Sequence, residues 1–166
     1  LGDNPSSFKG PRLPVEQVSW EHCQQFIGKC KVAGLKVKLP HEDEWEYACR
    51  GGTGNKQAFY WGDSLNGDKA NCDGTVPYGT TTEGPYLKKT TDVGTYESKA
   101  KHPWNLCDMH GNVWEWCDNL CTTTGSGRVF RGSWYDISGD CRSAIRGRRD
   151  PTDSYDYLGL RLALVP

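Results

Sequence analysis

The stretch NLCDMHGNVWEWCDN, at positions 105–119, decides the fold. Within it, tryptophans occupy alternate positions. In an extended chain, Trp114 and Trp116 lie on one side, and Val113 and Glu115 lie on the other. A period of two predicts a β-strand at 111–117 that directs both tryptophans toward one core. We expect these two rings and Trp134 to form the inner packing of the protein.

Outward from this strand, the composition of the 166-residue chain predicts one domain with an aromatic core, because it holds 7 Trp and 8 Tyr. The 20 glycines and 9 prolines indicate many turns, which excludes a coiled coil or a helical bundle. The formal net charge is −1, so we expect no nucleic-acid partner. No apolar run is long enough for a bilayer-spanning helix, so we expect no membrane insertion.

The remaining pattern predicts an α+β domain with two helices and short antiparallel strands. Apolar residues at helical spacing predict a helix at about 20–30, capped by Ser19, and a second helix is expected at 41–50. We interpret the acidic start of the second helix as a solvated face that matches the helix dipole. Further strands are expected at 37–39, 128–134 and 158–164, whereas 53–105 and 135–157 are predicted to be irregular.

Eight cysteines, at 23, 30, 49, 72, 107, 117, 121 and 141, are even in number and permit disulfides. Free cysteines that pack as small apolar residues are an equal alternative. The absence of a CxxC motif argues against a zinc ribbon and against a thioredoxin-type redox pair.

Eight stretches, taken in order, resemble the formylglycine-generating-enzyme (sulfatase-modifying factor) family. They are NPSSFKG at 4–10, LPVEQVSW at 13–20, LPHEDEWEYACRGG at 39–52, YWGD at 60–63, NLCDMHGNVWEWCDN at 105–119, RVFRGSW at 128–134, CRSAIR at 141–146 and LGLRLA at 158–163. The resemblance implies a loop-rich variant of the C-type-lectin fold, in a single domain that spans 1–166. We expect the strands that usually precede NPSSFKG in the family to be absent, and RGSW is one glycine shorter than the usual RGGSW.

The resemblance also offers an enzymatic alternative, because oxidases of this family bind copper through a pair of cysteines. Counted from Trp134, the pair falls on Asp136 and Cys141, so a single soft thiolate remains for Cu(I). The histidines at 22, 41, 102 and 110 show no metal-ligand spacing. We therefore expect no enzyme and no required cofactor; the alternatives are a formylglycine-type oxidase, or its degenerate relative, and a lectin-like module of fixed specificity.

One branch of the family serves as the variable proteins of diversity-generating retroelements, which mutate adenines while copying a template into the 3′ end of a gene. The segment that ends in LGLRLA resembles such a variable region. Mutating the adenines of Asn codons cannot produce Lys, Glu, Gln, Met or Trp, and 135–157 contains none of these five types. The alternative explanation is that loops favour Asp, Gly, Ser and Arg in any case.

This reading predicts a non-enzymatic, receptor-recognition protein whose ligand is a protein or another surface of unknown identity. It leaves localisation open and is compatible with display on a cell or virion. Tyrosines and arginines suit such a site, because they offer rigid contact area and bidentate hydrogen bonds. The expected ligand-binding, variable positions are Tyr135, Asp136, Ile137, Asp140, Ile145, Gly147, Arg148, Arg149, Asp150, Asp153, Tyr155, Asp156 and Tyr157. The expected scaffold positions between them are Cys141, Arg142, Ser143, Ala144, Arg146, Pro151 and Gly159.

The resemblance further implies a structural calcium site around the 105–119 stretch. Carried over, it comprises the side chains of Asp108 and Glu115 and the carbonyl groups of Met109, Gly111 and Val113, which are the hard oxygen ligands that calcium prefers. The alternative is that Asp108 caps a turn and that Glu115 pairs with an arginine. His110 is expected to lie at the surface or to pack against a loop rather than to bind metal.

Overall fold

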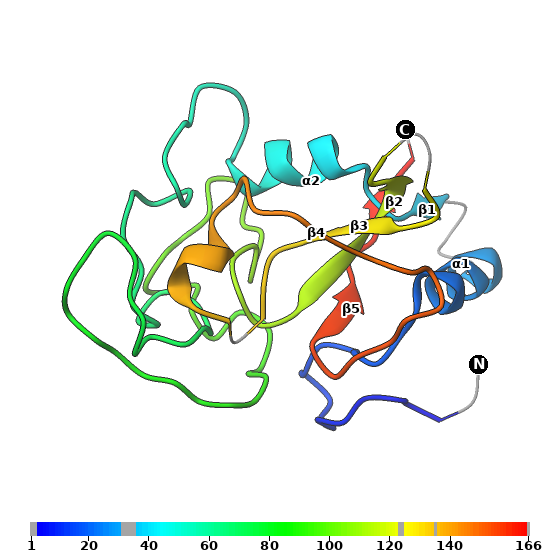
Figure 1. Cartoon of the computed structure of the whole chain (residues 1–166), viewed down its shortest axis with the longest axis horizontal. Coiled ribbons are helices and arrows are strands. Elements are labelled where there is room, and N and C mark those ends of the chain that lie inside the picture. The colour runs from blue at the N-terminus through cyan, green and yellow to red at the C-terminus, as the bar shows by residue number, and fades with distance from the viewer. Residues whose placement is uncertain (1–2, 31–35, 123–124, 135, 166) are drawn as a thin grey trace.

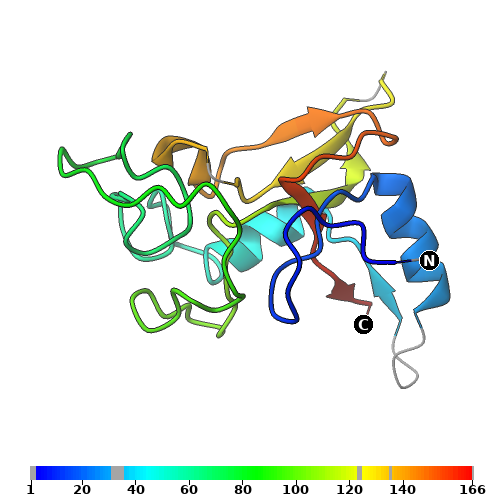
Figure 2. The same ribbon diagram turned by 90° about the horizontal axis from the view of Figure 1, so that it is seen from below.

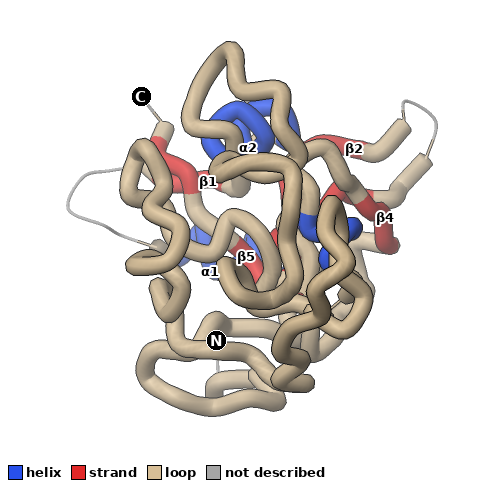
Figure 3. The backbone as a smooth tube through the Cα atoms, turned by 90° about the vertical axis from the view of Figure 1, so that its left-hand side faces the viewer, coloured by secondary structure: helices blue, strands red, loops and turns tan. Residues whose placement is uncertain are grey.

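The computed structural model describes residues 3–30, 36–122, 125–134 and 136–165. Its order of elements is α1 (Trp20–Lys29), β1 (Val37–Lys38), α2 (Glu42–Cys49), β2 (Trp114–Leu120), β3 (Arg128–Arg131), the 3₁₀ helix η1 (Ser138–Cys141), β4 (Gly147–Arg149), β5 (Leu158–Leu160) and β6 (Ala163–Leu164). Loops make up most of the remainder, as Figure 3 shows in tan. The α+β class with two helices is confirmed.

Ser19 caps the first helix as predicted, whereas the second helix begins at Glu42 and is capped by His41, which was expected to lie inside it. The Ser19 hydroxyl accepts the backbone N–H of His22 at 3.1 Å, and the imidazole Nδ1 of His41 accepts the N–H of Asp43 at 3.2 Å. Gly51, with a φ of +70°, follows α2 and ends it. In the described part of the chain, neither helix is long or apolar enough to cross a bilayer.

The main sheet has four strands in the order β4-β3-β2-β5 (Figure 1). Strands β2 and β3, like β3 and β4, are antiparallel, but β2 and β5 are parallel. Antiparallel pairing is therefore found as predicted, and the parallel pairing of β2 with β5 is an addition that the sequence did not indicate. The predicted strand at 158–164 is divided between two sheets, because β6 pairs with β1 instead.

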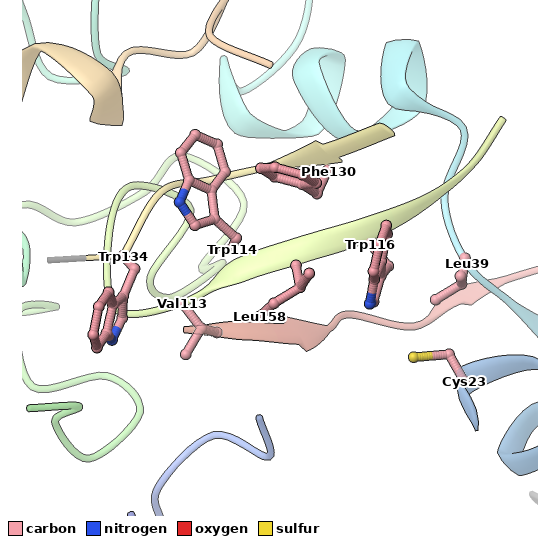
Figure 4. Close-up of a cluster of buried hydrophobic side chains, with 8 residues drawn as sticks. All are labelled: Cys23, Leu39, Val113, Trp114, Trp116, Phe130, Trp134 and Leu158. Carbon is pink, nitrogen blue, oxygen red and sulfur yellow. The ribbon is translucent and has the colours of Figure 1, made fainter. Parts of the chain in front are cut away.

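The first four residues of strand β2 are buried on both faces, and this position explains their composition. On one face, Trp114 and Trp116 belong to a cluster with Phe130 and Leu158, drawn in Figure 4. Cys117 belongs instead to a second cluster, which includes Trp45 of α2. Trp134 also joins the first cluster, so all three predicted tryptophans lie in the core.

Two sequence predictions about this region need correction. The strand begins at Trp114 rather than at 111, so Val113 precedes it and packs in the same cluster as the tryptophans. Glu42, expected on a solvated helix face, is 7% exposed. Its carboxylate pairs with Arg131 at 3.0 Å and with Arg146 at 2.9 Å, because the N-terminus of α2 packs over the sheet.

The long segment 53–105 contains no helix or strand among its described residues. It is held by a third apolar cluster, in which Phe59, Leu65 and Cys72 pack against Cys141. Short bridges, such as the antiparallel one between Leu65 and Tyr78, add local order. This loop region therefore supports the segment that follows β3.

Candidate functional site

The candidate surface, defined as residues 136–157, follows the outer edge of the four-stranded sheet (Figure 2). It starts with η1, continues as the edge strand β4 and returns through a loop to β5. The segment was predicted to be irregular, so β4 is a correction. Its strand pairing with β3 was not visible in the sequence, because Gly147–Arg149 has no period-two apolar pattern.

None of the twelve described candidate ligand positions lies in the buried core. The exposed ones are Ile137, Arg148, Arg149, Asp150 and Tyr155, and the half-buried ones are Asp136, Asp140, Ile145, Gly147, Asp153, Asp156 and Tyr157. Tyr135 lies outside the described residues. These twelve positions are therefore at least partly accessible, whereas Ser138, Cys141 and Ser143 between them are buried.

The expected scaffold positions divide into three groups. Cys141, Ser143 and Gly159 are buried, Arg142 and Pro151 are half-buried, and Ala144 and Arg146 are exposed. A Cβ atom at position 159 would lie 2.3 Å from the carbonyl oxygen of Val15, so glycine is required there. Arg146 is held at the surface by its ion pair with Glu42.

The backbone of the candidate surface is anchored by hydrogen bonds from residues outside it. These are Asp73 N–H to the carbonyl of Asp136 at 2.9 Å, Gln17 N–H to that of Tyr155 at 2.9 Å, and Trp114 N–H to that of Tyr157 at 2.8 Å. Each bond uses the main chain of the anchored residue. Its formation consequently does not depend on which side chain that residue carries.

His110 and Ser143 provide two further anchors. Burial lowers the pKa of His110 from its ordinary 6.5 to about 3, so the ring is neutral at pH 7. Its Nδ1–H donates to the carbonyl of Cys141 at 2.7 Å, and its Nε2 accepts the N–H of Tyr60 at 3.3 Å. The backbone N–H of Ser143 donates to Ala58 at 2.8 Å. His110 is thus a loop-packing residue rather than a surface one.

A cleft of about 420 Å³ opens in the candidate surface. The core rings of Trp114, Phe130 and Trp134 form its floor, and the half-buried candidate residue Tyr157 lines the cleft beside Trp134. The Trp114 and Phe130 rings meet edge to face at 4.9 Å, and those of Trp134 and Tyr157 lie 5.3 Å apart. Its rim carries the candidate residues Asp136, Asp140, Ile145, Gly147 and Arg149, together with Arg146.

Gly147 is an exception among the candidate positions. A Cβ atom there would lie 2.2 Å from a ring carbon of Phe130, well inside van der Waals contact. Any larger residue would have to displace the ring that packs against Trp114. The structure therefore does not favour Gly147 as an interchangeable position, and it belongs with the scaffold.

The residues carried over as a calcium site do not fit a calcium ion in this arrangement. Both carboxylate oxygens of Glu115 are engaged by Arg161, at 2.7 and 2.8 Å, and one also accepts the indole N–H of Trp45 at 2.7 Å. Asp108 accepts the N–H of Gly94 at 2.8 Å, and burial raises its pKa. The guanidinium of Arg161 neutralises the charge of Glu115, which confirms the alternative prediction that Glu115 pairs with an arginine.

Two of the three carbonyl groups of the expected calcium site already have contacts within the protein. The carbonyl of Gly111 accepts the N–H of Val113 at 3.1 Å, and that of Met109 lies 3.7 Å from the thiol of Cys49. Across the described residues, no three His, Cys, Asp or Glu side chains come together in a group able to hold a metal ion.

The two positions matched to the copper-binding cysteines have separate environments. Asp136 accepts the indole N–H of Trp114 at 2.9 Å at the rim of the cleft, whereas Cys141 is 1% exposed. Cys141 has a neighbouring thiol that the sequence did not reveal. Cys72 packs in the same apolar cluster, and a hydrogen bond with Cys141 lowers its pKa. A spacing of 69 residues gives no signal of this pairing.

The fold is that of the C-type-lectin-like, formylglycine-generating-enzyme class. Two solved structures share it: PvdO from Pseudomonas aeruginosa, with a TM-score of 0.74, 22% identity and coverage of 95% of this chain and 64% of that one, and Treponema denticola variable protein 1, with a TM-score of 0.73, 23% identity and coverage of 99% and 78%. The fold predicted from the resemblance is confirmed.

The sequence identifies the family itself. The model of the sulfatase-modifying factor enzyme 1-like domain matches residues 2–165, and the chain belongs to this family. It is 33% identical to the formylglycine-generating enzyme of Streptomyces coelicolor, over 92% of this chain and 53% of that protein. It is also 33% identical to the inactive Cα-formylglycine-generating enzyme 2 of Mus musculus, over 91% and 49%. The chain thus spans about half the length of these relatives, and the family includes both an enzyme and an inactive protein.

Proposed function

We propose that this chain is a non-enzymatic ligand-binding protein whose candidate surface is diversified by a retroelement. The observation that carries the proposal is the coincidence of two independent features. Residues 135–157 lack all five residue types that adenine mutagenesis of Asn codons cannot produce. The described candidate side chains in the same segment lie outside the core.

The anchoring of the backbone supports this proposal. Three carbonyl groups of the candidate surface accept hydrogen bonds from Asp73, Gln17 and Trp114, which lie outside it. Exchange of exposed side chains leaves such bonds intact and usually changes stability by no more than about 0.5 kcal/mol. The fold of Treponema denticola variable protein 1, which this chain shares, is an associational argument in the same direction.

The coding DNA provides the decisive test. We expect a second copy of the 3′ end of the gene nearby, differing from it at positions where that copy has adenine. Sibling genes should differ at the candidate positions and agree at Cys141, Ser143, Gly147 and Gly159. Homologous genes whose differences are spread evenly over the chain, with no second copy, would refute the proposal.

The Cys72–Cys141 pair favours a second candidate, a copper-dependent oxidase, because two thiolates suit Cu(I). Both residues are 1% exposed, however, and a hydrogen bond with the Cys72 thiol raises the pKa of Cys141. The same bond lowers the pKa of Cys72, so the pair favours one thiolate rather than the two that hold Cu(I), and a buried, protonated Cys141 is a poor copper ligand. Competition for Cu(I) with a chromogenic chelator under anaerobic conditions tests this alternative. We expect no copper transfer to the protein, and stoichiometric transfer that Cys141→Ser abolishes would favour the oxidase.

A further inference from the structure

The cleft in the candidate surface combines a permanent floor with an exchangeable rim. Trp114, Phe130 and Trp134 are 8%, 6% and 6% exposed and belong to the core cluster (Figure 4), so they are not free to vary. Of the rim residues, Asp136, Asp140, Ile145 and Arg149 are candidate variable positions, whereas Arg146 and Gly147 belong to the scaffold. The floor therefore offers aromatic faces to any ligand, whereas the rim determines which ligand is accepted.

The rim contains two carboxylates that form no direct ion pair in the described part of the chain. Asp136 and Asp140 line the cleft, and neither forms an ion pair there. Asp136 accepts one hydrogen bond, from the indole of Trp114. Burial and the charge of Asp136 raise the pKa of Asp140, and the charge of Arg142 opposes this rise.

The nearby arginines are already engaged elsewhere. Arg146 pairs with Glu42 at 2.9 Å. The guanidinium of Arg149 lies over the ring of Tyr155, 5.5 Å from its centroid. Arg142 donates its Nε–H to the carbonyl of Gly139 at 2.7 Å. Each of these guanidinium groups therefore has a partner other than Asp136 and Asp140. Arg146 and Arg149 still line the same cleft, and the charge of Arg142 lowers the pKa of Asp140, so a cationic ligand competes with these three arginines for the two carboxylates.

We propose that the cleft accepts a lysine or arginine side chain of a protein ligand, with its cationic group against Asp136 and Asp140 and its alkyl stem on the aromatic floor. Charge-assisted hydrogen bonds to carboxylates are the strongest neutral-pH contacts available to such a group. Long basic side chains also bury their stems on apolar surfaces, and aromatic faces attract cations. The inference rests on the proposed function, because it treats the candidate surface as the binding site.

Model compounds test the inference without knowledge of the natural ligand. The probes are the Nα-acetyl methylamides of lysine and arginine, with the norleucine analogue as an uncharged control of similar shape. Binding is followed by NMR at the indole N–H of Trp114, which contacts Asp136. We expect saturable shifts with the two cationic probes, with a dissociation constant on the order of 10 mM for one inserted side chain, and no saturation with norleucine.

Substitutions show whether the carboxylates are responsible. Asp140→Asn removes a charge with almost no change in volume and should raise the dissociation constants of the cationic probes about tenfold. Asp136→Asn keeps an oxygen for the Trp114 indole and should do the same. Asp118→Asn, an exposed aspartate on β2 outside the cleft, is the matched control and should leave binding unchanged.

Two outcomes would overturn the inference: equal binding of norleucine and lysine probes, or cationic binding that Asp140→Asn leaves intact. A failure of all probes to bind would also overturn it. None of these results bears on the second copy of the 3′ end in the DNA. Failure of the cation site and failure of the diversified-surface proposal are therefore distinguishable.

Discussion

Replacement of Trp116 by alanine tests the division of the molecule into a rigid core and an exchangeable surface. The Trp116 side chain is fully buried, it packs edge to face on Phe130 at 5.9 Å, and its indole N–H donates to the carbonyl of Val18 at 2.9 Å. Loss of a buried ring of this size costs about 3–5 kcal/mol. The unsatisfied carbonyl adds about 1 kcal/mol or more. For a chain of this length, we expect the unfolding midpoint to fall by on the order of 10 °C.

The same substitution at an exposed ring provides the control. Trp104 is 45% exposed and packs on Tyr47 with their ring centroids 5.3 Å apart, so Trp104→Ala should cost about 1 kcal/mol or less. Tyr155, which is 36% exposed in the candidate surface, should behave like Trp104. Urea unfolding followed by circular dichroism gives the free energies. If Tyr155→Ala destabilises the protein as much as Trp116→Ala, the candidate surface is part of the core and the reasoning fails. Trp116→Phe, which retains a ring, replaces the alanine variant if that does not fold.

Three further predictions concern particular sites. Gly147→Ala should destabilise the protein by about 1–3 kcal/mol in urea unfolding, because the new Cβ would overlap the Phe130 ring. Gly139→Ala is the control and should cost little, because its Cβ would lie 3.4 Å from its nearest neighbour. Equal effects of the two substitutions would contradict the steric argument. A chelator should leave the unfolding midpoint unchanged, because Glu115 is committed to an arginine; a fall of several degrees would restore the calcium hypothesis. The pKa of His110 is about 3 in the folded protein and 6.5 in the unfolded chain, so the unfolded chain takes up the proton at higher pH. The free energy of unfolding should therefore fall as pH falls from 6.5 toward about 3, by at most about 1.4 kcal/mol per pH unit. Unfolding at pH 7 and pH 5 measures this slope, and a His110→Gln variant that retains the full slope would exclude this residue as its source.

The helices were predictable because their signals are local. In α1, Ser19 and the apolar spacing of Cys23, Phe26 and Ile27 lie within a few residues of one another, and the observed helix differs from the prediction by one residue. The strand pairing was not predictable in the same way. That β5 lies parallel to β2 depends on a contact between Trp114 and Leu158 across 44 residues, and such long-range pairing leaves no period in the sequence.

The candidate surface was predictable as a segment but not in all its residues. Its composition marks 135–157, and the described candidate side chains there lie outside the core, but their role in binding stays a prediction. Gly147 was included because glycine is among the residues that mutated Asn codons can encode. Its steric conflict with Phe130 arises from the pairing of β4 with β3, which the sequence does not reveal. The sequence likewise gives no sign that Cys72 lies near Cys141, because 69 residues separate them.

The way the candidate surface is anchored explains how one fold could serve many ligands. A hydrogen bond to a side chain is lost when that side chain changes, whereas the carbonyl groups of Asp136, Tyr155 and Tyr157 remain after any substitution that keeps the backbone in place. Substitution of Tyr155 removes its stacking on Tyr157, in which the two ring centroids lie 4.8 Å apart. Under the proposed function, substitution in the candidate surface therefore removes contacts among its own side chains and two contacts with core tryptophans: the hydrogen bond of the Trp114 indole to Asp136 and the packing of Trp134 on Tyr157. Gly147, whose backbone lies against the Phe130 ring, has no room for a side chain.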